Sequence, residues 1–115
     1  MRIIVSGSHL VDFPEMEGYA TEKVARLSRY HHKIEKISVR LTAERAHRNE
    51  EHDFTCEIIV AVPGRDVEVV ERDRFMDKAI DKALERMKRT LIKAKEKSVS
   101  KKHKEGILAK LLSRF

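Results

Sequence analysis

The sequence predicts an α+β fold with the element order β-α-β-β-β-α, in which two helices cover one face of a four-stranded sheet. Two observations predict it: four short segments carry apolar residues at strand spacing, and two longer segments repeat them every three or four positions. The length of 115 residues fits one domain with a single core. A hydrophobic fraction of 41% excludes a wholly disordered chain, although 38% of the residues are charged.

The first two elements are a strand and a helix. Residues 2–6 are rich in β-branched side chains and end at Gly7, which predicts a short strand. A helix is predicted from about residue 14 to residue 30, with Asp12 and Glu15 placed as an acidic variant of a capping box. Its apolar residues recur at three- and four-residue spacing: Met16, Ala20, Val24 and Leu27.

The next three segments predict a meander of strands. Residues 37–41 alternate apolar and polar side chains, and after a polar stretch the same alternation returns in residues 53–60. Pro63 and Gly64 predict a turn into a last strand at residues 67–70. We expect one sheet face to pack under the helices and the other to face solvent.

A second, longer helix is predicted from Asp73, with one apolar face over about 20 residues. That face consists of Met76, Ala79, Ile80, Ala83, Leu84, Met87 and Leu91. We therefore divide the chain into a domain at residues 1–97 and a basic amphipathic tail at residues 98–115. The first part, 98–104, is interpreted as a linker or as part of the tail. Residues 107–115 place apolar side chains on one helical side, which fits docking on a partner and folding back onto the domain equally well.

Positive charge is concentrated in the C-terminal part of the chain. The net charge is +6, and residues 73–115 hold 14 basic and 6 acidic side chains, against 11 and 13 in residues 1–72. Acids at the start of the second helix and bases at its end stabilise the helix dipole, which explains part of this pattern. The six bases from Arg86 to Lys97, opposed by Glu96 alone, exceed that need. They predict a polyanionic partner, with a merely solvated face as the alternative.

Nine basic side chains are predicted to contact RNA. Four of them follow one side of the second helix at about 5 to 6 Å, a spacing comparable with that of successive phosphates: Arg86, Arg89, Lys93 and Lys97. If both helices share a sheet face, a smaller basic edge on the first helix would border the same groove. An aromatic fraction of 5% argues against stacking on single strands, so we expect recognition of structured RNA through its backbone. The set is Lys23, Arg26, Arg29, Lys82, Arg86, Arg89, Lys93, Lys95 and Lys97.

No catalytic or cofactor-binding pattern occurs in the sequence. There is no P-loop or GxGxxG motif, and the adjacent His31 and His32 fit no metal-ligand spacing. Cys56 alternates with apolar residues and is expected to be buried, while Asp53 and Glu57 are spaced as in any solvated strand. We therefore expect no enzyme, no metal, no cofactor and no small-molecule substrate.

Cysteine content and hydropathy predict where the protein works. One cysteine cannot form an internal disulfide, which fits a reducing compartment. No apolar run approaches the roughly 18 residues that a membrane span needs, and the N-terminus does not fit a secretion signal. We expect a cytoplasmic protein without a membrane partner.

Several segments match the pattern of a known family. They are the opening residues 1–7, Glu57-Ile58, Pro63-Gly64, Ala79-Ile80-Asp81 and the ending at 93–97. Over residues 1–97 the sequence resembles the bacterial ribosome hibernation-promoting factors, also called ribosome-associated inhibitor or sigma-54 modulation proteins. It departs from the family at Phe75 and Asp77, where the family usually carries Asp and Tyr.

The resemblance implies a fold similar to a double-stranded RNA-binding domain and a translation inhibitor that acts in stationary phase and stress. Such a protein binds the small ribosomal subunit and its ribosomal RNA between head and body. There it covers the messenger channel and the decoding positions of transfer RNA. By position, the family's basic residues fall on Arg86, Arg89, Lys93, Lys95 and Lys97, and near Lys23 and Arg26. Longer members carry a second domain that joins two ribosomes, so this chain looks like a short form.

A different class of function remains open. The alternative is a protein-interaction or membrane-surface module that acts through the amphipathic C-terminal tail, with the basic stripe serving only solubility.

Overall fold

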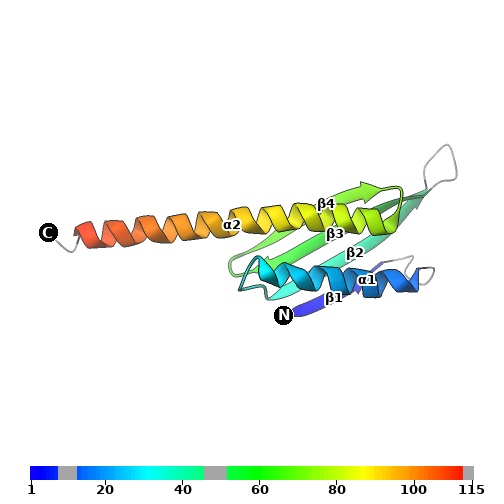
Figure 1. Ribbon diagram of the computed structural model, residues 1–115, viewed down its shortest axis with the longest axis horizontal. Helices are drawn as coiled ribbons and strands as arrows, with labels where there is room; N and C mark the ends of the chain where they lie inside the picture. Colours follow the sequence, from blue (N-terminus) through cyan, green and yellow to red (C-terminus); the bar gives the residue numbers. More distant parts are fainter. Residues whose placement is uncertain (8–12, 46–51, 113–115) are drawn as a thin grey trace.

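The computed structural model describes the backbone of residues 1–7, 13–45 and 52–112, and the side chains of residues 1–7, 13–43 and 54–94. The elements follow the predicted order (Figure 1). They are β1 (Arg2–Ser6), α1 (Pro14–Ala25), the 3-10 helix η1 (Arg26–Arg29), β2 (Lys36–Arg45), β3 (His52–Val62), β4 (Arg65–Asp73) and α2 (Met76–Leu112).

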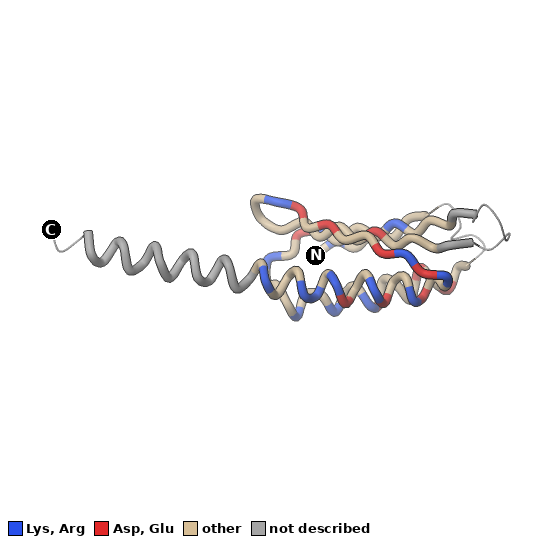
Figure 2. The backbone as a smooth tube through the Cα atoms, turned by 90° about the horizontal axis from the view of Figure 1, so that it is seen from above, with Lys and Arg blue, Asp and Glu red and all other residues tan. Residues whose placement is uncertain are grey.

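The strands form one mixed sheet in the order β1-β2-β3-β4. β1 runs parallel to β2, and the other two pairings are antiparallel, as the predicted meander requires. The register places Ile58 of β3 between Val39 of β2 and Val69 of β4, so apolar side chains share one face. Both helices lie on that face (Figure 2). The predicted architecture of a sheet with two helices on one side is therefore confirmed.

The core lies between the sheet and the helices and contains the apolar positions of both periodic patterns. Its fully buried residues include Ile37, Leu41, Ile58, Ile80, Met87, Leu91, Val24, Val39, Val60 and Cys56. At one end of the core, the rings of Phe13 and Phe54 meet edge to face, 5.6 Å apart. The apolar residues of the two predicted alternating strands therefore face the helices.

The start of α1 differs from the predicted capping box. Phe13 is the N-cap residue, no side chain caps the helix there, and Asp12 lies outside the described residues. Pro14 occupies the first turn, where its fixed φ favours helix and its missing N–H is not needed. The helix tightens into η1 before it ends at Tyr30, close to the predicted end.

The second helix is much longer than predicted. α2 continues without a break from Met76 to Leu112, and its second half extends beyond the sheet (Figure 1). Residues 98–104, predicted to be a linker or tail, are therefore helical, and the backbone of the distal segment continues α2 instead of turning back towards the sheet. Between Met76 and Glu105 the chain contains no Gly or Pro and is rich in Lys, Ala and Glu, which favour helix. In the part of the chain that the structure describes, no helix combines the length and apolarity that a membrane span requires.

Candidate nucleic-acid interface

α2 separates two surface grooves. The first, here called the β4 groove, lies between α2 and β4, measures about 580 Å³ and is lined by Glu71, Lys82, Glu85, Arg86, Arg89, Thr90 and Lys93. The second, the interhelix groove, lies between α2 and the first helical segment and measures about 300 Å³. It is lined by Lys23, Arg26, Leu27, Tyr30, Asp81, Leu84, Glu85 and Lys88. The β4 groove, with four cations against two acids, is the more basic of the two.

Two cations of the β4 groove are bound to the protein itself. The Lys82 Nζ lies 2.8 Å from the Asp73 Oδ2 and donates to the backbone carbonyl of Arg72 at 3.2 Å. The Arg86 guanidinium donates to the Glu71 Oε1 at 3.2 Å and to the Val70 carbonyl at 3.3 Å. Both side chains therefore satisfy carbonyls of the edge strand β4, which no further strand covers in the described sheet.

The Lys82–Asp73 pair keeps both groups ionised at neutral pH. The hydrogen bond from Lys82, helped by the backbone N–H of Phe75, lowers the pKa of the Asp73 carboxyl below its usual value. The same hydrogen bond raises the pKa of the Lys82 ammonium. Since the side chains of Lys82 and Arg86 are still 54% and 58% exposed, a phosphate can reach them, but it must compete with the carboxylates.

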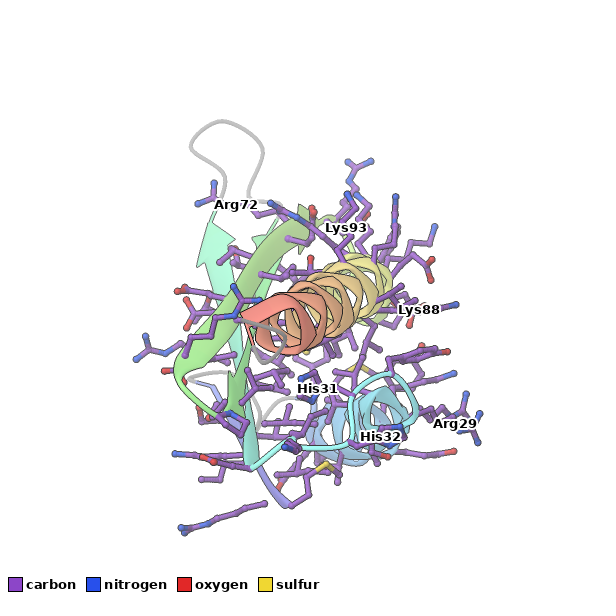
Figure 3. The ribbon with its side chains drawn as sticks, turned by 90° about the vertical axis from the view of Figure 1, so that its left-hand side faces the viewer. Arg29, His31, His32, Arg72, Lys88 and Lys93 are labelled. Atoms are coloured by element: carbon purple, nitrogen blue, oxygen red, sulfur yellow. The ribbon has the colours of Figure 1, made fainter. Side chains whose placement is uncertain are left out.

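Arg89 and Lys93 have a different environment. Both are exposed and line the β4 groove one and two turns beyond Arg86. Among the described residues, neither has an ion-pair partner. Figure 3 shows Lys93 leaving α2 on a different side from Lys88. Arg89 and Lys93 are therefore the groove cations most available to an external anion.

The interhelix groove is crossed by contacts that join the helices. Tyr19 of α1 donates a 2.5 Å hydrogen bond to the Asp81 Oδ1 of α2, and this bond raises the pKa of Tyr19 to about 12. The Lys88 Nζ lies 5.3 Å from the centroid of the Tyr30 ring, and the Lys23 Nζ lies 5.4 Å from that of Tyr19. These contacts indicate that the groove is largely a structural joint.

The structure changes the predicted arrangement of the basic residues. Arg86, Arg89 and Lys93 do share one side of α2, as predicted. The first-helix cations Lys23 and Arg26 do not border their groove, because α2 itself stands between the two sets. Instead, Lys23 and Arg26 face Lys88, and Arg26 pairs with Glu22 at 3.6 Å.

The prediction missed Lys88 as a groove residue. Lys88 follows Leu84 by four positions and Asp81 by seven, which places it on the side of α2 that faces α1. The remaining predicted residues lie apart from both grooves or cannot be placed. Arg29 is exposed on η1, and the side chains of Lys95 and Lys97 lie outside the described residues (Figure 3).

The cysteine and the two adjacent histidines lie apart from both grooves. Cys56 is buried, and burial raises the pKa of its thiol to about 12, so the thiol stays protonated. The His31 Nδ1 accepts the backbone N–H of Lys33, and His32 is exposed next to it. Within the described segments, no group of three or more potential ligands could hold a metal ion.

Known proteins share this sequence and fold. The chain is 35% identical over 102 residues to the ribosome hibernation promotion factor of Deinococcus radiodurans. This match covers 89% of the present chain and 52% of the relative. It is 29% identical over 101 residues to the ribosome hibernation promoting factor of Azotobacter vinelandii, covering 88% of this chain and 89% of the relative. The chain thus spans about half the length of the Deinococcus relative and most of the Azotobacter one.

Two solved structures have the same fold. The N-terminal domain of Thermus thermophilus Protein Y has a TM-score of 0.65 at 29% identity, covering 81% of this chain and 98% of that domain. A ribosomal subunit interface protein from Coxiella burnetii has a TM-score of 0.69 at 19% identity, covering 84% of this chain and 99% of that protein.

The α+β fold and the sequence are both similar to those of proteins named for ribosome hibernation or for the ribosomal subunit interface. Residues 3–99 match the family described as sigma 54 modulation protein / S30EA ribosomal protein. The chain belongs to this family, which confirms the resemblance identified from the sequence.

Proposed function

We propose that this protein is a hibernation factor that binds the small ribosomal subunit through its ribosomal RNA and silences translation. The observation that carries the proposal is the row of exposed cations along the β4 groove, led by Arg89 and Lys93. Family membership supports a ribosomal partner, and the cations support RNA as the component that is bound. A ribosomal partner also supports a cytoplasmic location.

Inhibition by occlusion requires a charged surface and no catalytic group. The site offers a rigid array of charges on a packed helix, with no metal-ligand group and no reactive thiol among the described residues. Arg89 and Lys93 stand about 5 to 6 Å apart on adjacent helical turns, which suits phosphates along one RNA strand. A folded body held there would block the messenger and transfer RNA sites without catalysing a reaction.

The first experiment is co-sedimentation of the protein with purified small subunits over a series of salt concentrations. If about six phosphates are neutralised, binding should weaken by roughly 10³-fold between about 50 and 200 mM salt. Inhibition of reporter synthesis in a cell-free translation system should decline in parallel. Failure to co-sediment even at the lowest salt would contradict the proposal.

Charge reversal tests the location of the site. Arg89→Glu with Lys93→Glu should abolish both co-sedimentation and inhibition, because repulsion replaces two phosphate contacts. The matched control is Lys36→Glu with Arg40→Glu, which changes the net charge equally but lies on β2, where both side chains are exposed away from the helices. If the control loses binding to the same degree, net charge rather than the β4 groove governs the interaction.

The continuation of α2 supports a second candidate function. Because α2 is helical through Leu112, its distal part could present an amphipathic surface to a protein or membrane partner. Truncation after Lys97 separates the two candidates. The RNA-binding proposal expects the truncated protein to retain subunit binding and the Arg86, Arg89 and Lys93 triple alanine variant to lose it, and the tail hypothesis expects the reverse.

A further inference from the structure

Phe75 is an exposed aromatic residue next to the β4 groove. Its side chain is 54% exposed, whereas Phe13, Phe54, Tyr19 and Tyr30 all pack against the core. Phe75 is thus the only exposed Phe or Tyr among the described residues. An aromatic surface of this kind, left in water without a packing role, is available for contact with a partner.

The backbone at Phe75 is fixed in place. The Phe75 N–H donates to the Asp73 Oδ1 at 3.0 Å, and the Phe75 carbonyl accepts the N–H of Ala79 at 3.0 Å. The second bond is the first i to i+4 bond of α2, so Phe75 stands at the N-terminal end of this helix. A partner would therefore meet a ring on a preorganised turn.

One cation lies over the ring, and further cations follow along the helix. The Lys78 Nζ lies 5.1 Å from the centroid of the Phe75 ring. Asp73 holds the Phe75 backbone with one carboxylate oxygen and the Lys82 ammonium with the other. Phe75, Lys82 and Arg89 are spaced by seven residues, about two helical turns, so the ring lies at one end of the cationic side of α2.

We infer that Phe75, with Lys78 and Lys82 beside it, is a stacking site for an unpaired nucleotide base at the end of the row of phosphate-binding cations. The inference rests on the proposed function and specifies the RNA that fits it. The base stacks on the face of the ring that Lys78 leaves open, and the two ammonium groups lie near the adjoining phosphates. Because every base has a π face, the site tolerates sequence but requires a base that is not paired. The site would add one stacking contact to the backbone recognition that the sequence predicts.

Three variants separate stacking from other roles of Phe75. Phe75→Leu keeps an apolar side chain but removes the ring, and Phe75→Tyr keeps the ring. Val70→Ala is the control, because Val70 is an exposed apolar residue of the adjoining strand on the open sheet face. All are measured by co-sedimentation with small subunits in a salt series, and their folding is checked by thermal unfolding.

Stacking predicts a specific pattern of results. Phe75→Leu should weaken binding by roughly 5- to 150-fold, the range expected for one stacked base, without changing the salt dependence. Phe75→Tyr and Val70→Ala should bind like the wild type. Lys93→Ala should instead flatten the salt dependence, by about one unit of the logarithmic slope. If the wild type binds small subunits and Phe75→Leu binds them with the same affinity, the stacking inference is wrong, but the proposed function is unaffected.

A second measurement does not depend on the ribosome. A short single-stranded RNA that carries a fluorescent adenine analogue should lose fluorescence on binding the wild type and Phe75→Tyr, and keep it with Phe75→Leu, because stacking quenches the analogue. If the wild type fails to bind subunits but still quenches the analogue through Phe75, the stacking site survives and the proposed function fails. If the wild type and Phe75→Leu quench the analogue equally, Phe75 is not a stacking site. If Phe75→Leu nevertheless reduces subunit binding, the result indicates that the ring contacts a protein.

Discussion

At the scale of single residues, cations that look alike in the sequence have different roles. Lys82 and Arg86 neutralise Asp73 and Glu71 and satisfy carbonyls of β4, whereas Arg89 and Lys93 extend beyond those acids. The difference arises because Glu71 and Asp73 are the core-side residues of the last part of β4, next to the first turns of α2. Glu85 lines the same groove as Arg89 and Lys93, but neither cation forms an ion pair with it in the described structure.

Removing these internal counter-ions should strengthen RNA binding. In Glu71→Gln with Asp73→Asn, the amide oxygens can still accept from Arg86 and from the Phe75 N–H, whereas the Lys82 ammonium loses its carboxylate partner. The removed charges no longer compete with phosphates. We expect tighter subunit binding and a salt dependence steeper by about one to two units of logarithmic slope. Filter binding or co-sedimentation in a salt series measures both quantities.

The control for this variant has the same change in net charge. Asp66→Asn with Glu68→Gln alters two exposed acids of β4 on the open sheet face, away from α2. It should leave the salt dependence nearly unchanged. Weaker binding of the Glu71 and Asp73 variant would mean that the carboxylates position the cations rather than compete for them.

The hydrogen bond between Tyr19 and Asp81 should stabilise the fold in a pH-dependent way. It raises the pKa of Tyr19 from its ordinary value of 10.0 to about 12, so the neutral phenol is favoured in the folded state. Its contribution is complete below pH 10 and is lost as the pH rises to 12. Tyr19→Phe should therefore lower the free energy of unfolding by about 0.5 to 1.5 kcal/mol at neutral pH and by progressively less above pH 10.

Chemical denaturation from neutral pH upward measures this difference. Tyr30→Phe serves as the control because it keeps the ring next to Lys88, and no hydrogen bond of its hydroxyl occurs among the described residues. If the free energies of unfolding of the wild type and Tyr19→Phe differ by the same amount at every pH up to 12, the pKa shift does not arise from this bond.

At the scale of elements, close contact between β1 and β2 depends on one glycine. A Cβ at Gly7 would lie 2.1 Å from the carbonyl oxygen of Leu41, which is backbone and cannot move aside easily. Gly7→Ala should therefore destabilise the protein by about 1 to 3 kcal/mol, as overpacking does elsewhere. Urea unfolding followed by circular dichroism gives the value.

Gly18 provides the matched comparison for Gly7. It lies on the exposed side of α1, and a Cβ there would meet nothing within 4 Å. Since alanine is the better helix former, Gly18→Ala should stabilise the protein by about 0.5 to 1 kcal/mol. Equal effects of the two substitutions would show that chain entropy, and not the contact with Leu41, determines the effect at Gly7.

At the scale of the whole molecule, α2 extends beyond the sheet that its first half covers (Figure 1). The last fully buried residue among the described side chains is Leu91, and the backbone of α2 continues to Leu112. Truncation after Lys97 should therefore leave Tm and the cooperativity of unfolding unchanged, and should reduce only the helical signal in circular dichroism. A large fall in Tm would show that the distal helix packs on the domain in solution.

The order of elements and the identity of the core could be predicted from the sequence. Period-two alternation in β2 and β3 and the seven apolar positions from Met76 to Leu91 each require burial on one side, and only one layered arrangement satisfies them all. The end of α2 could not be predicted from composition, because a basic stretch such as 98–104 suits an exposed helix as well as a linker. The predicted capping box relied on Asp12, which lies outside the described residues, and the structure assigns the N-cap position of α1 to Phe13, which has no side-chain acceptor.

The sequence by itself determined the fold class, the core and the excess of cations on the second helix, because hydrophobic periodicity and charge are local properties of the chain. Only the tertiary structure decided which cations remain available to RNA. The packing of α2 between β4 and α1 divides the basic residues between two grooves, brings Asp73 to Lys82 and Glu71 to Arg86, and leaves Phe75 exposed. These outcomes depend on distances between residues of different helices and strands. The periodicity within a single element does not determine such distances.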